Sequence, residues 1–206
     1  MKAFNIVLFI LLFITTCKAQ EQRFVPGLKV GISTSQVEGD SYTGFHKAGI
    51  LGGAMLAANV NTKWSVQFEV IYIQKGSKTV NHSAGVDTGF YFLQLNYLEV
   101  PLLAQYHLNK FTFEVGPSFG YLINYGEASG YMDITGERPF KNTETSLSVG
   151  IACKLWKNFS IHWRYTNSLL SIRDFATGGT NWDNAGERNN VLAFSLTYQF
   201  AKQNNE

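Results

Sequence analysis

The chain has 206 residues, of which 15% are aromatic and only 16% are charged, and its formal net charge at pH 7 is +2. This length suits a single domain. The near-neutral balance of 17 basic and 15 acidic residues gives no sign of a nucleic-acid partner, and we expect none.

The N-terminus predicts a cleaved export signal. Lys2 supplies a positive charge, and residues 6–14 form an unbroken apolar run that is too short to span a bilayer as a helix. Small residues then precede a cleavage point after Ala19. We therefore expect a signal peptide at residues 1–19 and a single mature domain at residues 20–206.

The two cysteines bear on this interpretation. Cys17 is a candidate for the acylated residue of a lipoprotein signal, but Thr15 and Thr16 match that motif poorly, so we favour cleavage. Only Cys153 then remains, and no intramolecular disulfide can form.

Eight segments of the mature chain have the pattern of β-strands. In most of them, apolar or aromatic residues alternate with polar or small ones, and this period of two is typical of strands. In chain order they lie near residues 28–33, 47–58, 64–72, 90–106, 111–125, 146–155, 159–166 and 192–200. Two segments are less regular, because 47–58 is rich in Gly and Ala and 90–106 has apolar residues on both faces.

Residue size indicates which face of these strands points inward. An eight-stranded barrel has an interior just wide enough for side chains, which suits the Gly, Ser and Thr of the polar face. The Phe, Trp, Tyr, Leu and Ile of the other face would form too large an apolar patch for a soluble monomer, but they suit lipid. We therefore predict an all-β, eight-stranded antiparallel up-and-down transmembrane β-barrel, surrounded by the lipid of a Gram-negative outer membrane.

The connections between the strands alternate in length. The long ones are 38–44, 75–89, 126–144 and 167–189, and the short ones are 59–63, 107–110 and 156–158. Outer-membrane barrels have short periplasmic turns and longer extracellular loops, so both termini are expected in the periplasm. We expect any specific activity, including contacts with other envelope or secretion proteins, in the last three long loops.

Several segments resemble one family. Residues 96–103, Asn-Tyr-Leu-Glu-Val-Pro-Leu-Leu, are similar to the signature of the PorT-like outer-membrane β-barrel family of Bacteroidetes, with Val100 in place of the usual isoleucine. Residues 27–31, 44–46 and 67–76 also resemble segments of that family. The resemblance implies an outer-membrane barrel. The family is named after a protein needed for type IX secretion, although most relatives have no assigned role.

Charged residues on the polar faces predict a cluster inside the barrel. The alternation directs these side chains inward: Lys29, Glu69, Glu99, Glu114, Lys154 and Arg164. Buried charges must be paired, so a structural salt-bridge network is favoured over an ion path or acid–base chemistry. We expect Glu69, Glu99 and Arg164 in one interior layer.

Other features give no sign of a catalytic or cofactor site. Pro101 cannot donate to a β-ladder, so we expect a bulge or bend there. The spacing of His and Cys residues does not suit zinc, and the Gly-rich segments lack a phosphate-binding context, so no metal or cofactor is expected. The charged residues of the last long loop are expected to be solvated, with a calcium or ligand site as a lesser alternative: Arg173, Asp174, Asp183, Glu187 and Arg188.

The sequence therefore predicts a non-enzymatic outer-membrane protein, either a structural one or an adaptor that presents its loops to a partner. One alternative is a component of the type IX secretion machinery. Another is a small membrane-embedded lipid-modifying enzyme, which would need a nucleophile and a base at the outer rim. A third is a soluble lipocalin-like carrier, whose apolar face would line the cavity.

Overall fold

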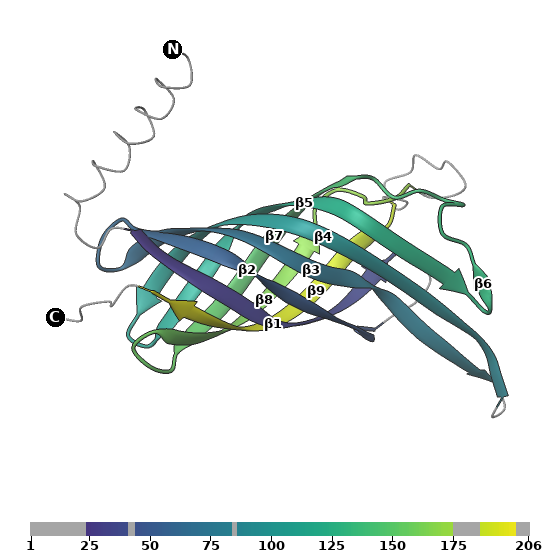
Figure 1. Cartoon of the computed structure of the whole chain (residues 1–206), viewed down its shortest axis with the longest axis horizontal. Helices are drawn as coiled ribbons and strands as arrows, with labels where there is room; N and C mark the ends of the chain where they lie inside the picture. The colour runs from purple at the N-terminus through teal and green to yellow at the C-terminus, as the bar shows by residue number, and fades with distance from the viewer. Residues whose placement is uncertain (1–23, 41–43, 84–85, 175–185, 201–206) are drawn as a thin grey trace, which may run out of the picture.

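The computed structural model describes residues 24–40, 44–83, 86–174 and 186–200, and the side chains of all of these except residues 80–89. Within these ranges there are nine antiparallel strands, and eight of them form a closed ring (Figure 1). They are β1 (Phe24–Glu38), β2 (Lys47–Asn59), β3 (Trp64–Ser83), β4 (Val86–Leu108), β5 (Phe111–Ser129), β6 (Met132–Asp133), β7 (Thr143–Lys154), β8 (Phe159–Ser168) and β9 (Arg188–Gln199). No helix in these ranges is long and apolar enough to cross a membrane.

The predicted eight-stranded antiparallel barrel is confirmed. Eight strands each pair with their neighbours along the chain, and pairing of β1 with β9 closes the ring. The two-residue β6 is an addition to the end of β5. The predicted signal peptide lies outside the described residues.

The short turns lie at one end of the barrel. Residues 60–63, 109–110 and 155–158 connect consecutive strands there, at the end where β1 begins and β9 finishes (Figure 1). Because short turns are periplasmic in such barrels, this end faces the periplasm.

One of the predicted long loops, residues 75–89, is largely strand, so that prediction is wrong. β3 continues to Ser83 and β4 begins at Val86, although we expected a loop over residues 75–89. Outside the membrane both faces of a strand contact water, so its outward residues need not be apolar. The backbones of β3 and β4 therefore continue to pair beyond the point where the apolar alternation in the sequence stops.

At their extracellular ends these strands extend beyond the rest of the barrel (Figure 1). β2 pairs with β3 only as far as Ile73, whereas β4 pairs with β3 as far as Ser83. We call the extension the blade, comprising residues 78–83, 86–90 and 129–133.

The outer wall is apolar, as the alternation predicts. Its most exposed side chains include Val30, Ile32, Phe119, Tyr121 and Phe194. In the membrane these side chains contact lipid, where their exposure carries no penalty.

Tyr125 departs from this pattern. A register shift between Asn96 and Tyr97 of β4 reverses the phase of β5, which places Tyr125 against the interior with its ring 5.1 Å from that of Phe140. Continued alternation over residues 111–125 predicts an outward Tyr125, because periodicity does not reveal a bulge.

The expected bulge at Pro101 is not present. Pro101 pairs with Ser118 in the same register as the pairs beyond it, and the shifts in β4 pairing lie at residues 81–82 and 96–97. A proline removes one donor from the ladder but inserts no residue, so the register is kept.

We predict that Gly76→Ala destabilises the barrel. Gly76 has φ 137°, and a Cβ there would lie 2.0 Å from the carbonyl oxygen of Leu93. We expect the free energy of unfolding, measured by urea titration in detergent micelles, to fall by about 1–3 kcal/mol. Gly126→Ala is the control, because open space surrounds that position. Equal stability of the two variants would contradict the prediction.

Candidate functional site

Charged side chains cross the interior of the barrel near its middle. Arg164 of β8 donates to both carboxylate oxygens of Glu69 at 2.8 Å, and its Nε lies 2.8 Å from Glu114. Lys29 of β1 lies 2.5 Å from Glu69. We call these four residues, with His162, the central network.

Neutral groups complete the central network. The Gln67 amide donates to Glu69 at 2.5 Å and the Gln105 amide donates to Glu114 at 3.2 Å. His162 Nδ1 lies 3.4 Å from the Glu114 carboxylate. With two cations and two carboxylates, the network is electrically balanced and its buried charges are paired.

A second cluster, the upper network, lies closer to the extracellular end. Lys75 Nζ is 2.7 Å from Glu99 and 3.1 Å from Glu144. Ser118 donates to Glu99 at 2.6 Å, and Ser168 donates to Glu144 at 2.7 Å. One ammonium thus serves two carboxylates, and further hydrogen bonds come from the hydroxyl groups and from the Asn189 amide, which donates to Glu144 at 3.0 Å.

The six charged residues predicted to point inward, Lys29 included, are distributed over three places. Glu69, Glu114 and Arg164 are together in the central network, whereas Glu99 pairs with Lys75 in the upper network. Lys154 is half-buried at the periplasmic end of β7.

Sequence reasoning missed Lys75 and Glu144, because both fall in segments predicted as loops. A signal was available for Lys75. It lies six residues after Glu69, so continued alternation along β3 directs both side chains inward.

Beyond the two networks, an apolar cluster occupies part of the extracellular half of the interior. It includes Val37, Leu93, Leu95, Ile172 and Val191, all essentially inaccessible to solvent. The cavity bounded by Lys29, Lys75 and their neighbours has a volume of about 10 Å³, enough for about one water molecule. The described side chains therefore fill the middle of the bore.

Arg173 and Glu187 are buried, so the expectation that they are solvated loop residues is wrong. Their backbones form a β-bridge, and Arg173 Nε donates to Glu187 at 2.8 Å. Arg173 also lies 2.7 Å from Glu127 and covers the ring of Phe140. Burial raises the pKa of the Glu187 carboxyl, and the guanidinium of Arg173 opposes this shift. Asp174 is exposed, and Asp183 lies outside the described residues.

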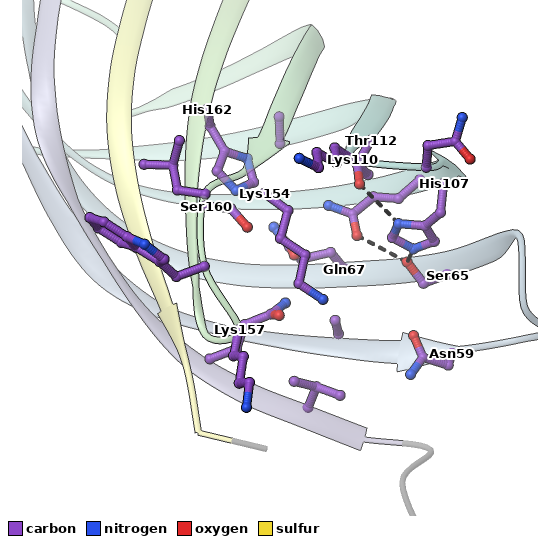
Figure 2. Close-up of a pocket in the computed structure, with 18 of the residues that line it drawn as sticks. Asn59, Ser65, Gln67, His107, Lys110, Thr112, Lys154, Lys157, Ser160 and His162 are labelled. Carbon is purple, nitrogen blue, oxygen red and sulfur yellow. Dashed lines mark hydrogen bonds between the residues drawn. The ribbon is translucent and has the colours of Figure 1, made fainter. Parts of the chain in front are cut away.

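The periplasmic end of the bore opens into a cavity of about 740 Å³, which we call the vestibule (Figure 2). Its lining includes Lys110, Lys154 and Lys157, with His162 toward the central network. His107 is held through both ring nitrogens, with Nε2 2.7 Å from Ser65 Oγ and Nδ1 2.9 Å from Thr112 Oγ1. The wall is thus polar, basic and internally hydrogen-bonded.

The chemistry of these sites favours structure and binding over catalysis. The carboxylates of both networks are fixed in ion pairs, an arrangement that holds charge in place. In the part of the chain that the structure describes, no three His, Cys, Asp or Glu side chains are grouped so as to hold a metal ion.

We predict that Arg164→Met strongly destabilises the barrel, because it leaves Glu69 and Glu114 without their shared guanidinium. Loss of one partner of a buried ion pair costs about 3–5 kcal/mol, which urea titration in micelles would measure. The control is Arg138→Met, because the Arg138 side chain is 41% exposed and lies 3.5 Å from Glu187; its effect should stay below about 1 kcal/mol. Equal losses in both variants would refute the prediction.

We also predict that the purified protein does not form a solute channel, because its bore is filled. Proteoliposomes should swell in arabinose no faster than protein-free liposomes. Swelling at the rate of a general porin would show that the interior opens in the membrane.

Comparison with known proteins agrees with this architecture. The family model described as "Outer membrane protein beta-barrel domain" matches residues 6–200. None of the curated proteins matches the chain.

Three solved structures illustrate the likeness. The attachment invasion locus protein Ail of Yersinia pestis, solved in complex with the heparin analogue sucrose octasulfate, is 14% identical over 87% of this chain and 100% of that one, with a TM-score of 0.49. Neisserial surface protein A is 13% identical over 87% and 98%, with a TM-score of 0.47. The N-terminal β-barrel domain of Pseudomonas aeruginosa OprF is 11% identical over 88% and 100%, with a TM-score of 0.41.

These likenesses are too distant to carry an argument about function. The family match spans nearly the whole chain and places the protein in the outer membrane. The chain belongs to the outer membrane protein β-barrel domain family.

Proposed function

We propose that the protein is a non-enzymatic outer-membrane scaffold that presents its extracellular blade to a protein partner. The observation that carries this proposal is the extension of the blade beyond the membrane-spanning wall (Figure 1). A barrel with a purely structural role in the membrane would not need strands that continue beyond it into water.

Exposed apolar side chains on the blade support a protein as the partner. Tyr131 is 99% exposed and Met132 is 74% exposed, in the turn that joins β5 to β6 and in β6 itself. The ring of Phe90 packs edge-on against Tyr131, with 5.9 Å between the centroids. Aromatic and Met side chains are enriched in protein interfaces, and here they are held on a paired β-structure.

The filled interior supports a scaffold rather than a transporter. The central and upper networks tie opposite walls of the barrel together, so the blade stands on a rigid base. Their carboxylates are paired, which argues against the lipid-modifying enzyme considered as an alternative.

We further propose that the chain is a PorT-like protein of Bacteroidetes, exported with a signal peptide cleaved after Ala19. The resemblance to that family rests on residues 67–76 and 96–103. These segments contribute Glu69, Lys75 and Glu99 to the two networks, so the matching residues are ones that stabilise a barrel. Participation in type IX secretion is therefore the second candidate, supported by the resemblance alone.

Photo-crosslinking in cells tests the scaffold proposal. A photoreactive amino acid in place of Tyr131 should give a discrete protein adduct on a denaturing gel. The same amino acid in place of the lipid-facing Ile50 is the control and should give none. Absence of an adduct at Tyr131, or equal adducts at both positions, would contradict the proposal.

Deletion of the gene separates the alternatives. Loss of secreted type IX cargo would favour the second candidate, and unchanged cargo export would exclude an essential role in that machinery. A changed lipid A or phospholipid profile would overturn the assignment of a non-enzymatic protein.

A further inference from the structure

We propose that the open edge of β3 in the blade binds an extended, acidic segment of the partner protein, which adds to the sheet as a further strand. The proposal rests on the scaffold function proposed above and narrows the partner to a protein with such a segment. At the base of the blade β4 is paired on both sides, with β3 and with β5. Beyond Ile73, β3 is paired with β4 alone, and within the described residues no strand pairs with its other edge (Figure 1).

Hydroxyl groups of β1 close the lower part of this edge. Ser33 Oγ donates to the carbonyl oxygen of Gln74 at 2.7 Å, and Ser35 Oγ donates to that of Gly76 at 3.0 Å. The carbonyl groups of these two residues therefore point away from β4, toward the open edge, and both are already bonded. The part of the edge that can accept another strand begins after Gly76.

The backbone groups of Lys78 and Val80 also point to the open edge. In an antiparallel ladder the N–H and C=O of one residue point to the same side, and this side alternates along the strand. Phe90, the pairing partner of Val80, accepts from the N–H of Gly130 at 2.7 Å, so its carbonyl group points to β5 and not to β3. Val80 and Phe90 are therefore a non-hydrogen-bonded pair, and the N–H and C=O of Val80, like those of Lys78, face outward from the sheet edge. Such groups are a template for an added strand.

Two lysines at the start of this edge indicate the charge of the added segment. Lys47, the first residue of β2, is only 5% exposed. Its ammonium donates to the carbonyl oxygen of Ala48 at 2.9 Å and lies 5.3 Å from the centroid of the Phe92 ring. Phe92 is the pairing partner of Lys78, so the Lys47 ammonium lies at the level where the open edge begins.

Within the described residues, no carboxylate forms an ion pair with Lys47 or with the exposed Lys78. The charged group that interacts with Lys47 is Lys78, which is itself a cation. Buried charges in folded proteins are ordinarily paired, as they are in both networks of this barrel. A carboxylate on the added strand supplies the missing counter-charge. Pairing of two copies of this chain through the same edge would instead bring their lysines together, and like charges oppose such a contact.

Photo-crosslinking from position 131 tests strand addition. Phe90 pairs with Val80 and its ring contacts Tyr131, so a photoreactive residue in place of Tyr131 lies at the level of the open edge. Val80→Pro removes the N–H at this edge but no hydrogen bond to β4, a change that edge strands tolerate. We expect the adduct yield to fall about tenfold, the loss expected from one interstrand hydrogen bond. Val80→Ala is the matched control, because it keeps the N–H, and it should retain the wild-type yield.

Neutralisation of the lysines tests the acidic character of the segment. Lys47→Gln and Lys78→Gln should each lower the adduct yield about threefold to tenfold, the effect of losing one charge-assisted contact. Lys141→Gln is the control, because Lys141 is exposed at the same end of the barrel and pairs with Asp174 at 2.7 Å; its yield should not change. Heat-modifiable migration on a gel establishes that each variant is folded. Lys78→Gln alters an exposed side chain and provides the test if Val80→Pro does not fold.

The outcomes distinguish strand addition from the scaffold function. Absence of an adduct from position 131 in the otherwise wild-type chain overturns both. Equal adduct yields in the wild type, Val80→Pro and Val80→Ala overturn strand addition and leave the scaffold function intact. Unchanged yields in Lys47→Gln and Lys78→Gln contradict an acidic segment. An adduct with the mass of two copies of this chain identifies a second copy as the occupant and likewise overturns the proposal.

Discussion

The structure depends on the need to neutralise charge in the middle of a barrel, where there is no room for bulk water. Arg164 meets this need by joining Glu69 and Glu114, and it thereby links β8 to β3 and β5 across the bore. In a low-dielectric interior an unpaired carboxylate is costly, so these strands must keep the spacing that the three side chains require. The apolar cluster on the extracellular side and the vestibule on the periplasmic side lie to either side of this central network.

The two ends of the barrel consequently differ in character. Toward the extracellular side, Lys75 and its two carboxylates are followed by an apolar cluster and then by the buried Arg173. Toward the periplasm, the interior remains polar, open and basic. A single filled segment thus separates the extracellular blade from an open periplasmic cavity.

Much of this fold follows from the sequence because lipid imposes a strict period of two on every strand it surrounds. The number of strands, their order and the inward direction of Glu69, Glu114 and Arg164 were therefore accessible. The ion pairing of Arg164 with Glu69 was not accessible, because the two residues are 95 positions apart in the chain. The blade, Lys75 and the buried Glu187 were missed for a related reason: above the membrane the outer face is no longer required to be apolar. The inward rotation of Tyr125 arises from a bulge that no periodicity marks.

The position of Lys29 has a consequence for biogenesis. Lys29 lies on β1, whose pairing with β9 is the seam between the first and last strands, and it contacts Glu69 on β3. Arg164, the other cation near Glu69, lies on β8, so of these two pairs only Arg164–Glu69 joins an early and a late part of the chain. While the sheet is still open, Glu69 can pair with Lys29 two strands away, and Arg164 can pair with Glu114 two strands away. Closure of the seam then brings Arg164 to Glu69 and joins these two charge-paired halves into one network.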